Sequence, residues 1–322
     1  MKTFYWLLKR EFWEHRGGFL WAPIVTGGIF LVLNVMAIIT AEVLSARHGV
    51  HFGGGADIQS MMRHADAGDL AQVGAAADVA MISSMGMIGI VMGIVVLFYC
   101  LGSLYDDRRD RSVLFWKSLP ISNTNTVLSK VASAAIVAPV IAVVVSIICG
   151  LLQLLMFAIV LSFHGINVWQ LLTLSHPLRA VGSLLSNVPL YALWALPAIG
   201  WLMLCSSGAR SKPFLWAVAV PVVLGLLVSW FGIMGLFNLP TAWFWGNVVQ
   251  RVLLSVFPGS NLVFDKHSAL NMGDMSDNDP LAVLSPAHTY GLLASPNLWI
   301  GVIAGLALIA GAIWFRRVRD DS

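Results

Sequence analysis

The sequence predicts an all-α membrane protein that crosses the bilayer six times. Its 322 residues are 58% hydrophobic and only 11% charged, and the mean hydropathy is +0.82. Soluble domains carry about 25% charged residues, because a folded globule needs a polar surface. The composition therefore excludes a soluble domain, and it equally excludes a disordered chain or a disulfide scaffold.

Six apolar stretches are long enough to cross the hydrocarbon core, which takes about 20 mostly apolar residues in a helix. The third is longer than a bilayer requires, so we expect it to tilt, to bend near Pro139 or to project from the membrane. The fourth is short and contains Pro189 and Pro197. The predicted spans are 19–41, 79–104, 131–163, 188–205, 213–237 and 298–315.

The distribution of Lys and Arg predicts the orientation. Six spans place both termini on one side, and 14 of the 19 Lys and Arg residues fall on that side: four before the first span, five in 105–130, two in 206–212 and three after the last span. The positive-inside rule therefore predicts cytoplasmic termini. The outer segments 42–78, 164–187 and 238–297 are longer and acidic.

The centres of the predicted spans contain no Asp, Glu, Lys, Arg or His. Carriers driven by protons or ions usually place titratable groups there, so proton coupling is not expected. Asn34 in the first span and Gln153 in the third are the polar residues available, and we interpret each as an interhelical hydrogen-bond partner. Any energy for movement would come from outside the membrane.

No catalytic or metal site is predicted. The chain has no G-x-x-x-x-G-K-[ST], H-E-x-x-H or G-x-S-x-G motif. The three cysteines lie in or beside apolar runs without metal-ligand spacing, so we interpret them as buried hydrophobic residues. His48 and His51 form an H-x-x-H pair, and these residues could be metal ligands together with downstream acidic and histidine side chains (His64, Asp57, Asp66 and Asp69), although the spacing matches no defined metal site. The segment around them is interpreted as a solvated loop.

The most informative segment lies between the second and third predicted spans. Residues 105–122 read Tyr-Asp-Asp-Arg-Arg-Asp-Arg-Ser-Val-Leu-Phe-Trp-Lys-Ser-Leu-Pro-Ile-Ser. Charges of both signs are followed by an apolar run and by Leu119-Pro120, which stops a helix. Ser122 and the residues after it can cap the start of the third span. A short amphipathic helix parallel to the membrane fits this pattern.

This segment resembles the cytoplasmic loop of ABC-2-type permeases, the membrane subunits of ATP-binding-cassette exporters. In that family an acidic and basic cluster follows the second span, an apolar stretch ends in Leu-Pro-[Ile/Val]-Ser, and a Lys, here Lys130, precedes the third span. The leader helix, six spans and long outer segment before the last span also match. The resemblance implies one ABC-2-type transmembrane domain over residues 1–322, with 105–130 as its coupling loop.

In this family the short helix of the loop docks onto the ATPase subunit and transmits its closure. The resemblance implies that the chain itself binds no cofactor, that ATP and Mg are used by the partner ATPase, and that a second permease subunit completes a homodimer or heterodimer. The path would lie between the two permease subunits, lined by parts of spans one, two and five. The coupling role falls on Asp106, Asp107, Arg108, Arg109, Asp110, Arg111, Phe115, Trp116, Lys117, Leu119 and Pro120.

Residues 1–18 are predicted to form an interfacial leader helix, similar to the connecting helix of the family. Phe4, Leu8 and Phe12 recur every four residues on one face, and Trp6 and Trp13 suit the headgroup boundary. The alternative is a simple basic topology anchor.

The outer segment 238–297 is predicted to contain one or two short helices over 241–257. We expect them to lie at the outer interface or to re-enter it, as in the family. A seventh span is the alternative, and Arg251 and the Pro258-Gly259 break argue against it.

Two other functions stay open: an ATP-independent secondary carrier, and a non-transport membrane anchor or assembly protein. The first predicts transport that depends on ion gradients, and the second predicts normal function without an ATPase. The resemblance favours export, and a bacterial cytoplasmic membrane is the expected location. No nucleic-acid partner is expected, because the net charge is only +3. A span interior without charges favours hydrophobic or amphipathic cargo.

Overall fold

The computed structural model describes residues 2–48, 67–109, 122–163, 174–235, 241–264 and 281–319. Every regular element within these ranges is a helix, which confirms the all-α class. Six helical stretches are long and apolar enough to cross a membrane, and each overlaps one of the predicted spans. This is the architecture of a multi-pass membrane protein.

Several of these stretches are built from consecutive helical segments. The π-helical segments η2 and η3 continue the helices on either side of them, and η1 continues into α2. The elements in chain order are α1 (Lys2–Glu14), η1 (Gly17–Trp21), α2 (Ala22–His48), α4 (Ala67–Ser103), α5 (Tyr105–Arg109), α7 (Asn123–Ala132), η2 (Ser133–Val137), α8 (Ala138–Phe163), α10 (Pro177–Gly208), α11 (Pro213–Ile233), α12 (Thr241–Phe244), η3 (Trp245–Gln250), α13 (Arg251–Leu254), α14 (Ser260–Phe264), α15 (Pro286–Thr289), the 3-10 segment η4 (Tyr290–Ala294) and α16 (Pro296–Arg319).

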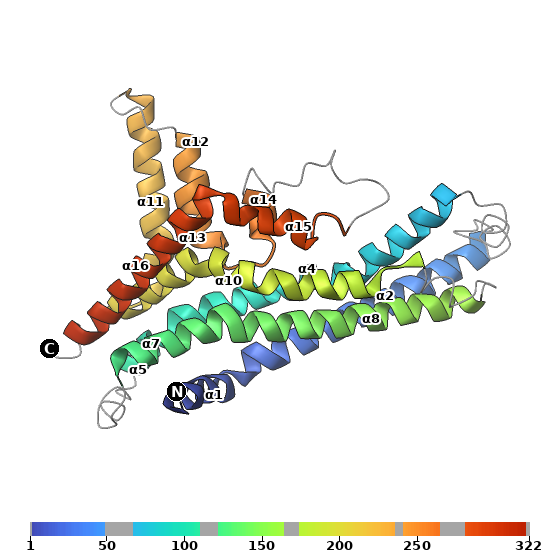
Figure 1. Cartoon of the computed structure of the whole chain (residues 1–322), viewed down its shortest axis with the longest axis horizontal. Coiled ribbons are helices and arrows are strands. Elements are labelled where there is room, and N and C mark those ends of the chain that lie inside the picture. Colours follow the sequence, from blue (N-terminus) through green and yellow to red (C-terminus); the bar gives the residue numbers. More distant parts are fainter. Residues whose placement is uncertain are drawn as a thin grey trace.

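The long helices α4, α8 and α10 form the centre of the bundle. α4 packs on both α8 and α10, α2 packs against α4 and α8, and α16 packs along α10. Helices α1, α5, α7 and the last turn of α16 gather at one end of the molecule, at the lower left of Figure 1. We call this end the base of the bundle. The core contains fully buried side chains such as Phe19, Ile88, Met92 and Met203.

The third span begins earlier than predicted. Its helix runs without a break from Asn123, whereas the sequence placed the start of the span at 131. Ser122 is the N-cap, as expected, and its hydroxyl oxygen accepts a hydrogen bond of 3.2 Å from the Asn125 N–H. The first turns are helical because this cap satisfies a free amide and Val127 is buried in the core.

The fourth and fifth spans also differ from their predicted limits. α10 is much longer than the predicted 188–205, because polar residues at its start bond within the helix: the Asn187 amide donates to the Ser183 carbonyl at 2.8 Å. α11 ends at Ile233 instead of 237, since Gly235 adopts a φ of +67°, a left-handed conformation that ends helices. Residues 236 and 237 lie outside the described residues.

Two glycines bring the backbones of α10 and α16 into direct contact. A Cβ atom built on Gly200 would lie 2.6 Å from the Gly305 carbonyl oxygen, and one built on Gly305 would lie 2.8 Å from the backbone nitrogen of Pro197. Small residues permit this close approach, which membrane helices use in place of a hydrophobic driving force. The crossing of the two helices is therefore fixed at these glycines.

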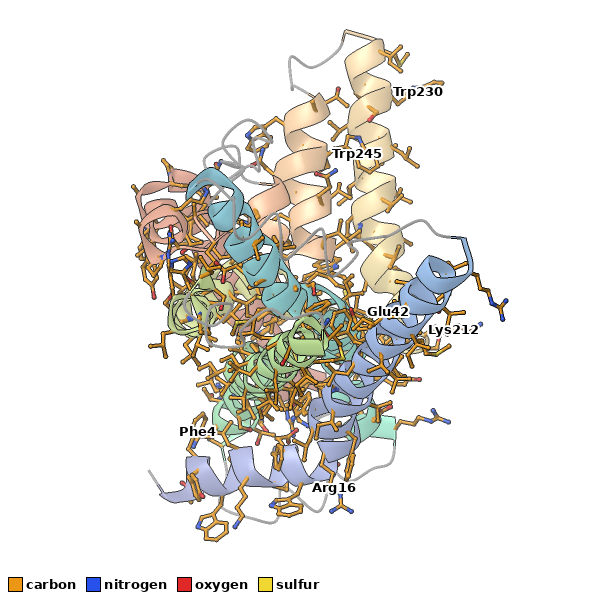
Figure 2. The ribbon with its side chains drawn as sticks, turned by 90° about the vertical axis from the view of Figure 1, so that its right-hand side faces the viewer. Phe4, Arg16, Glu42, Lys212, Trp230 and Trp245 are labelled. Carbon is orange, nitrogen blue, oxygen red and sulfur yellow. The ribbon has the colours of Figure 1, made fainter. Side chains whose placement is uncertain are left out.

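Helix α11 pairs with the helical segment formed by α12, η3 and α13, and the two stand away from the bundle in Figure 1. The indole N–H of Trp245 donates to the Ser229 hydroxyl at 2.9 Å, and the same ring covers Gly225. Figure 2 shows Trp245 between the two helices and Trp230 on the outside of α11. Residues 241–254 are thus helical, while their position at the outer interface stays a prediction.

The two polar residues of the spans bond to each other. Gln153 is buried in α8, and its side-chain amide donates a hydrogen bond of 3.0 Å to the Asn34 side-chain oxygen in α2. The prediction that each residue is an interhelical hydrogen-bond partner is confirmed. This bond helps to position α2, whose surface is otherwise largely apolar and exposed.

A double-mutant cycle on Asn34→Leu and Gln153→Leu is expected to give a coupling of about 0.6 kcal/mol, the average for such bonds in a membrane protein. The measurement is reversible unfolding in mixed detergent. Thr40→Val is the control, because the Thr40 hydroxyl donates to the Met36 carbonyl oxygen within its own helix. Strict additivity of the two Leu substitutions would contradict the role of this bond.

Candidate functional site at the base of the bundle

The inner face of the leader helix centres on a charged residue. Glu11 is 0% exposed, and Leu7, one helical turn earlier, is also buried. The predicted inner residues Phe4, Leu8 and Phe12 are only half-buried and lie beside this line. The sequence pattern placed apolar residues inward, but a carboxylate can be buried when a cation and hydrogen-bond donors meet it.

The outer face of the leader helix carries tryptophan and basic side chains. Trp6 and Trp13 are exposed. The Lys9 ammonium lies 4.9 Å from the centre of the Trp6 ring, and the Arg16 guanidinium lies 5.7 Å from that of Trp13. Figure 2 shows Phe4 and Arg16 towards the two ends of this helix. Aromatic and basic residues together suit a membrane–water interface.

Three donors meet the Glu11 carboxylate. The Lys130 ammonium lies 3.2 Å from one oxygen, the Tyr99 hydroxyl donates to the other at 2.9 Å, and the Arg10 guanidinium donates at 2.6 Å. Burial opposes the charge of Glu11, but Lys130 and Arg10 outweigh it and hold the pKa of this carboxyl below its ordinary value of 4.5. Glu11 is therefore ionised at neutral pH.

Lys130 also approaches a second carboxylate. Its ammonium, 2% exposed, lies 3.6 Å from an Asp107 oxygen, and the Arg316 guanidinium lies 3.4 Å from the same oxygen. Glu11, Lys130, Asp107 and Arg316 thus form one line of alternating charges, which we call the charge network. It joins α1, α7, α5 and α16, and its two acids balance its two bases.

Arg108 fixes α5 to the end of α10. Its guanidinium donates to the carbonyl oxygens of Ser206 at 2.5 Å and Ala209 at 3.1 Å, where the helix leaves carbonyl groups without intrahelical partners. The Ser206 hydroxyl accepts hydrogen bonds from the N–H groups of Leu104 and Tyr105. These bonds hold the break between α4 and α5.

The predicted coupling residues are thus divided. Asp107 and Arg108 point into the base and bind other helices, whereas Asp106 and Arg109 are exposed on α5. Asp110, Arg111, Phe115, Trp116, Lys117, Leu119 and Pro120 lie outside the described residues. Arg109 and Ser122 therefore mark the two described ends of the predicted docking segment.

The described residues contain no group of three or more His, Cys, Asp or Glu side chains placed to hold a metal ion. His51 of the H-x-x-H pair lies outside the described residues.

Glu11, Tyr99 and Arg316 were not predicted as site residues. Two of the three partners of Glu11, Tyr99 and Lys130, lie 88 and 119 positions away along the chain, so no local spacing reveals them. The available signal was an acidic residue one turn from Leu7 on the inner face of an otherwise basic leader. Lys130 was noted from the family resemblance, but as part of a loop.

Comparison of the chain with protein-family models, with curated proteins and with solved structures gives no match. The geometry of the charge network and the resemblance of residues 105–122 are therefore the two observations from which a function is proposed.

Replacing Lys130 by Met is expected to lower the free energy of unfolding by about 3–5 kcal/mol, because Glu11 stays buried without its cation. The double variant Glu11→Gln/Lys130→Met should recover much of this loss. Lys9→Met is the matched control, since Lys9 is exposed on the same end of the molecule. Equal losses in the Lys130→Met and Lys9→Met variants would show that the network is not a stabilising contact.

The lowered pKa of Glu11 predicts a specific pH dependence. Ionised Glu11 contributes stability that is fully present above pH 4.5 and is lost as the pH falls through the lowered pKa. The stability difference between the natural chain and Glu11→Gln should therefore shrink towards acid pH. Denaturant titrations of both proteins between about pH 3 and pH 6 measure this. A difference that does not change with pH would argue against the assignment.

Proposed function

We propose that this chain is the membrane permease subunit of an ATP-driven exporter of the ABC-2 type. The observation that carries the proposal is the charge network. It holds in place the helices on both sides of the segment that resembles the family's ATPase-docking loop. Six apolar helices of sufficient length support the membrane part of the proposal. The exporter assignment itself rests on the resemblance.

The network suits the transmission of force. Asp107 lies in α5, which continues the second span, and Lys130 lies in α7, which continues into the third. Both residues bind through the network to α1 and to Arg316 of α16. A displacement of residues 110–121 would therefore be transmitted to the second, third and sixth spans and to the leader helix together.

In the proposed cycle, a separate ATPase pair binds ATP with Mg and closes. This closure displaces the docking segment and the base, and the path changes from inward to outward access. The base would face the cytoplasm of a bacterial cell, as the Lys and Arg distribution predicts. The described surfaces of α2 and α11 are rich in exposed apolar side chains, which fits faces toward lipid or toward a second permease subunit.

The test is co-purification with a candidate ATPase subunit, one whose own sequence contains the phosphate-binding G-x-x-x-x-G-K-[ST] motif, followed by reconstitution in liposomes. Asp107→Asn is expected to reduce the stimulation of ATP hydrolysis about fivefold or more, in line with typical coupling energies. Asp110→Ala or Arg111→Ala should reduce transport more than membrane insertion. Glu42→Gln, at the far end of α2, is the control (Figure 2).

Three outcomes would overturn the proposal. Transport by the purified chain alone, driven by an ion gradient, would favour a secondary carrier. Normal cellular function without any ATPase partner would favour an anchor or assembly protein. Full coupling in all three base and loop variants, with the ATPase still bound, would exclude the docking segment as the link.

A further inference from the structure

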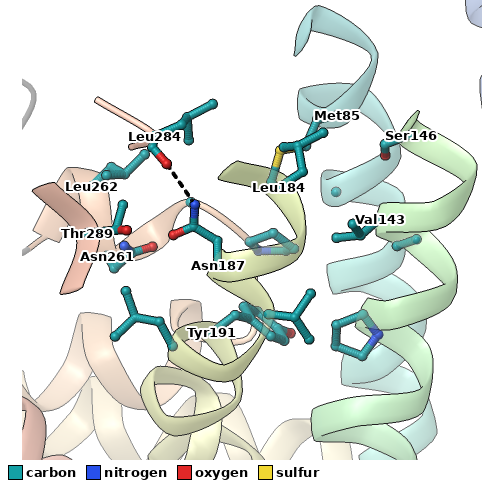
Figure 3. Close-up of a pocket in the computed structure, with 17 residues that line it drawn as sticks. Met85, Val143, Ser146, Leu184, Asn187, Tyr191, Asn261, Leu262, Leu284 and Thr289 are labelled. Carbon is teal, nitrogen blue, oxygen red and sulfur yellow. Dashed lines mark hydrogen bonds between the residues drawn. The ribbon is translucent and has the colours of Figure 1, made fainter. Parts of the chain in front are cut away.

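A mostly apolar cavity opens between three central helices, away from the charge network. Its walls come from α4, α8 and α10, and it is closed on another side by residues 258–262 and by Leu284 and Thr289 (Figure 3). The volume that the centre of a water-sized sphere can occupy is about 50 Å³. One water molecule needs about 10–15 Å³ of this volume. The empty space around it, mouth included, is about 640 Å³. The small volume favours a slim molecule over a bulky rigid one.

The cavity follows from one stripe of residues on each helix. On α8 the lining positions are 139, 142, 143 and 146, and on α10 they include 184, 187, 188 and 191. Both sets follow the spacing of a single helix face. Gly89 of α4 and Ala142 of α8 have small or absent side chains, so the three faces meet without filling the space between them.

Asn187 supplies a polar group at one end of the cavity. Its side-chain N–H₂ group donates to the carbonyl oxygens of Ser183 at 2.8 Å and Leu284 at 3.0 Å. These two bonds fix the amide, and its oxygen accepts no hydrogen bond from the described residues. Figure 3 shows this oxygen turned toward Asn261 and Thr289, while Met85 and Val143 lie on the opposite, apolar side.

We propose that this cavity binds a slim amphipathic molecule: an alkyl chain with a neutral hydrogen-bond-donating head, of which a long-chain alcohol is the simplest example. The chain would lie against the apolar faces of α4 and α8, and its hydroxyl would donate to the Asn187 oxygen. A mostly apolar space with a few placed polar groups is typical of ligand sites. The site does not rest on the proposed transport function, because two of its three helices, α8 and α10, lie outside the spans expected to line the path.

The test uses the full chain in lipid nanodiscs and a long-chain alcohol that carries a photoreactive diazirine on its alkyl chain. Mass spectrometry of the labelled peptides should locate the probe on α8 and α10. Gly89→Leu is expected to lower labelling about tenfold, because Gly89 lines the cavity and a leucine side chain there would occupy part of it. Gly86→Leu is the matched control, since a Cβ atom on Gly86 meets nothing within 4 Å.

A second variant separates the polar contact from the space. Asn187→Leu should reduce the advantage of dodecanol over dodecane as a competitor about fivefold, the value of one hydrogen bond. Labelling by a diazirine alkane should persist in this variant, which shows that the cavity is intact. If Gly89→Leu fails to fold, Val143→Phe blocks the same space from α8.

Equal labelling of the natural chain, Gly89→Leu and Val143→Phe would overturn the proposal, as would label that maps outside the cavity walls. Equal competition by dodecanol and dodecane in the natural chain would overturn the role of Asn187. Neither result would affect the ATPase coupling experiment, so the two proposals fail independently.

Discussion

The pairing of Glu11 with Lys130 places an anion and a cation inside the protein, where each is tolerated because of the other. An ion left there without its partner would cost several kcal/mol, about 3–5 in comparable proteins. Moving the leader helix away from the bundle would separate Glu11 from Lys130 and leave the Lys130 ammonium buried without its anion, which costs this free energy. It is part of the fold of the base, in addition to any role as an interfacial anchor.

Polar bonds and close glycine contacts together set the positions of the helices. In lipid, apolar side chains gain little from contact with one another, so packing depends on specific fits. The bond between Asn34 and Gln153 positions α2, and the contact between Gly225 and Trp245 joins α11 to the helix that follows it. The charge network does the same at the base, where four segments from distant parts of the sequence meet.

The sequence predicted the features that the bilayer imposes on each span. It missed the features that depend on contacts between residues far apart in the chain. Length and apolar composition locate spans because the hydrocarbon core imposes both, and the Ser122 cap was visible because capping is local. The start of the third span was missed because hydropathy does not register that Lys130 has a carboxylate partner in the leader. The early part of α10 was missed because Ser183 and Asn187 resemble loop residues until their bonds are known. Glu11 was also missed, because its role depends on bonds to residues far from it in the sequence.

The contact between Gly200 and Gly305 lies partway along α16, while each end of that helix is held by an arginine. Arg316 joins it to the base, and Arg251, whose guanidinium lies 4.3 Å from the centre of the Trp194 ring, donates to the Asn297 and Leu298 carbonyls at its start. A rigid rod held at an intermediate point turns about that point. Tilting of α16 at the base would therefore move its first turn in the opposite direction. The contact between the two glycines would be the pivot of this motion.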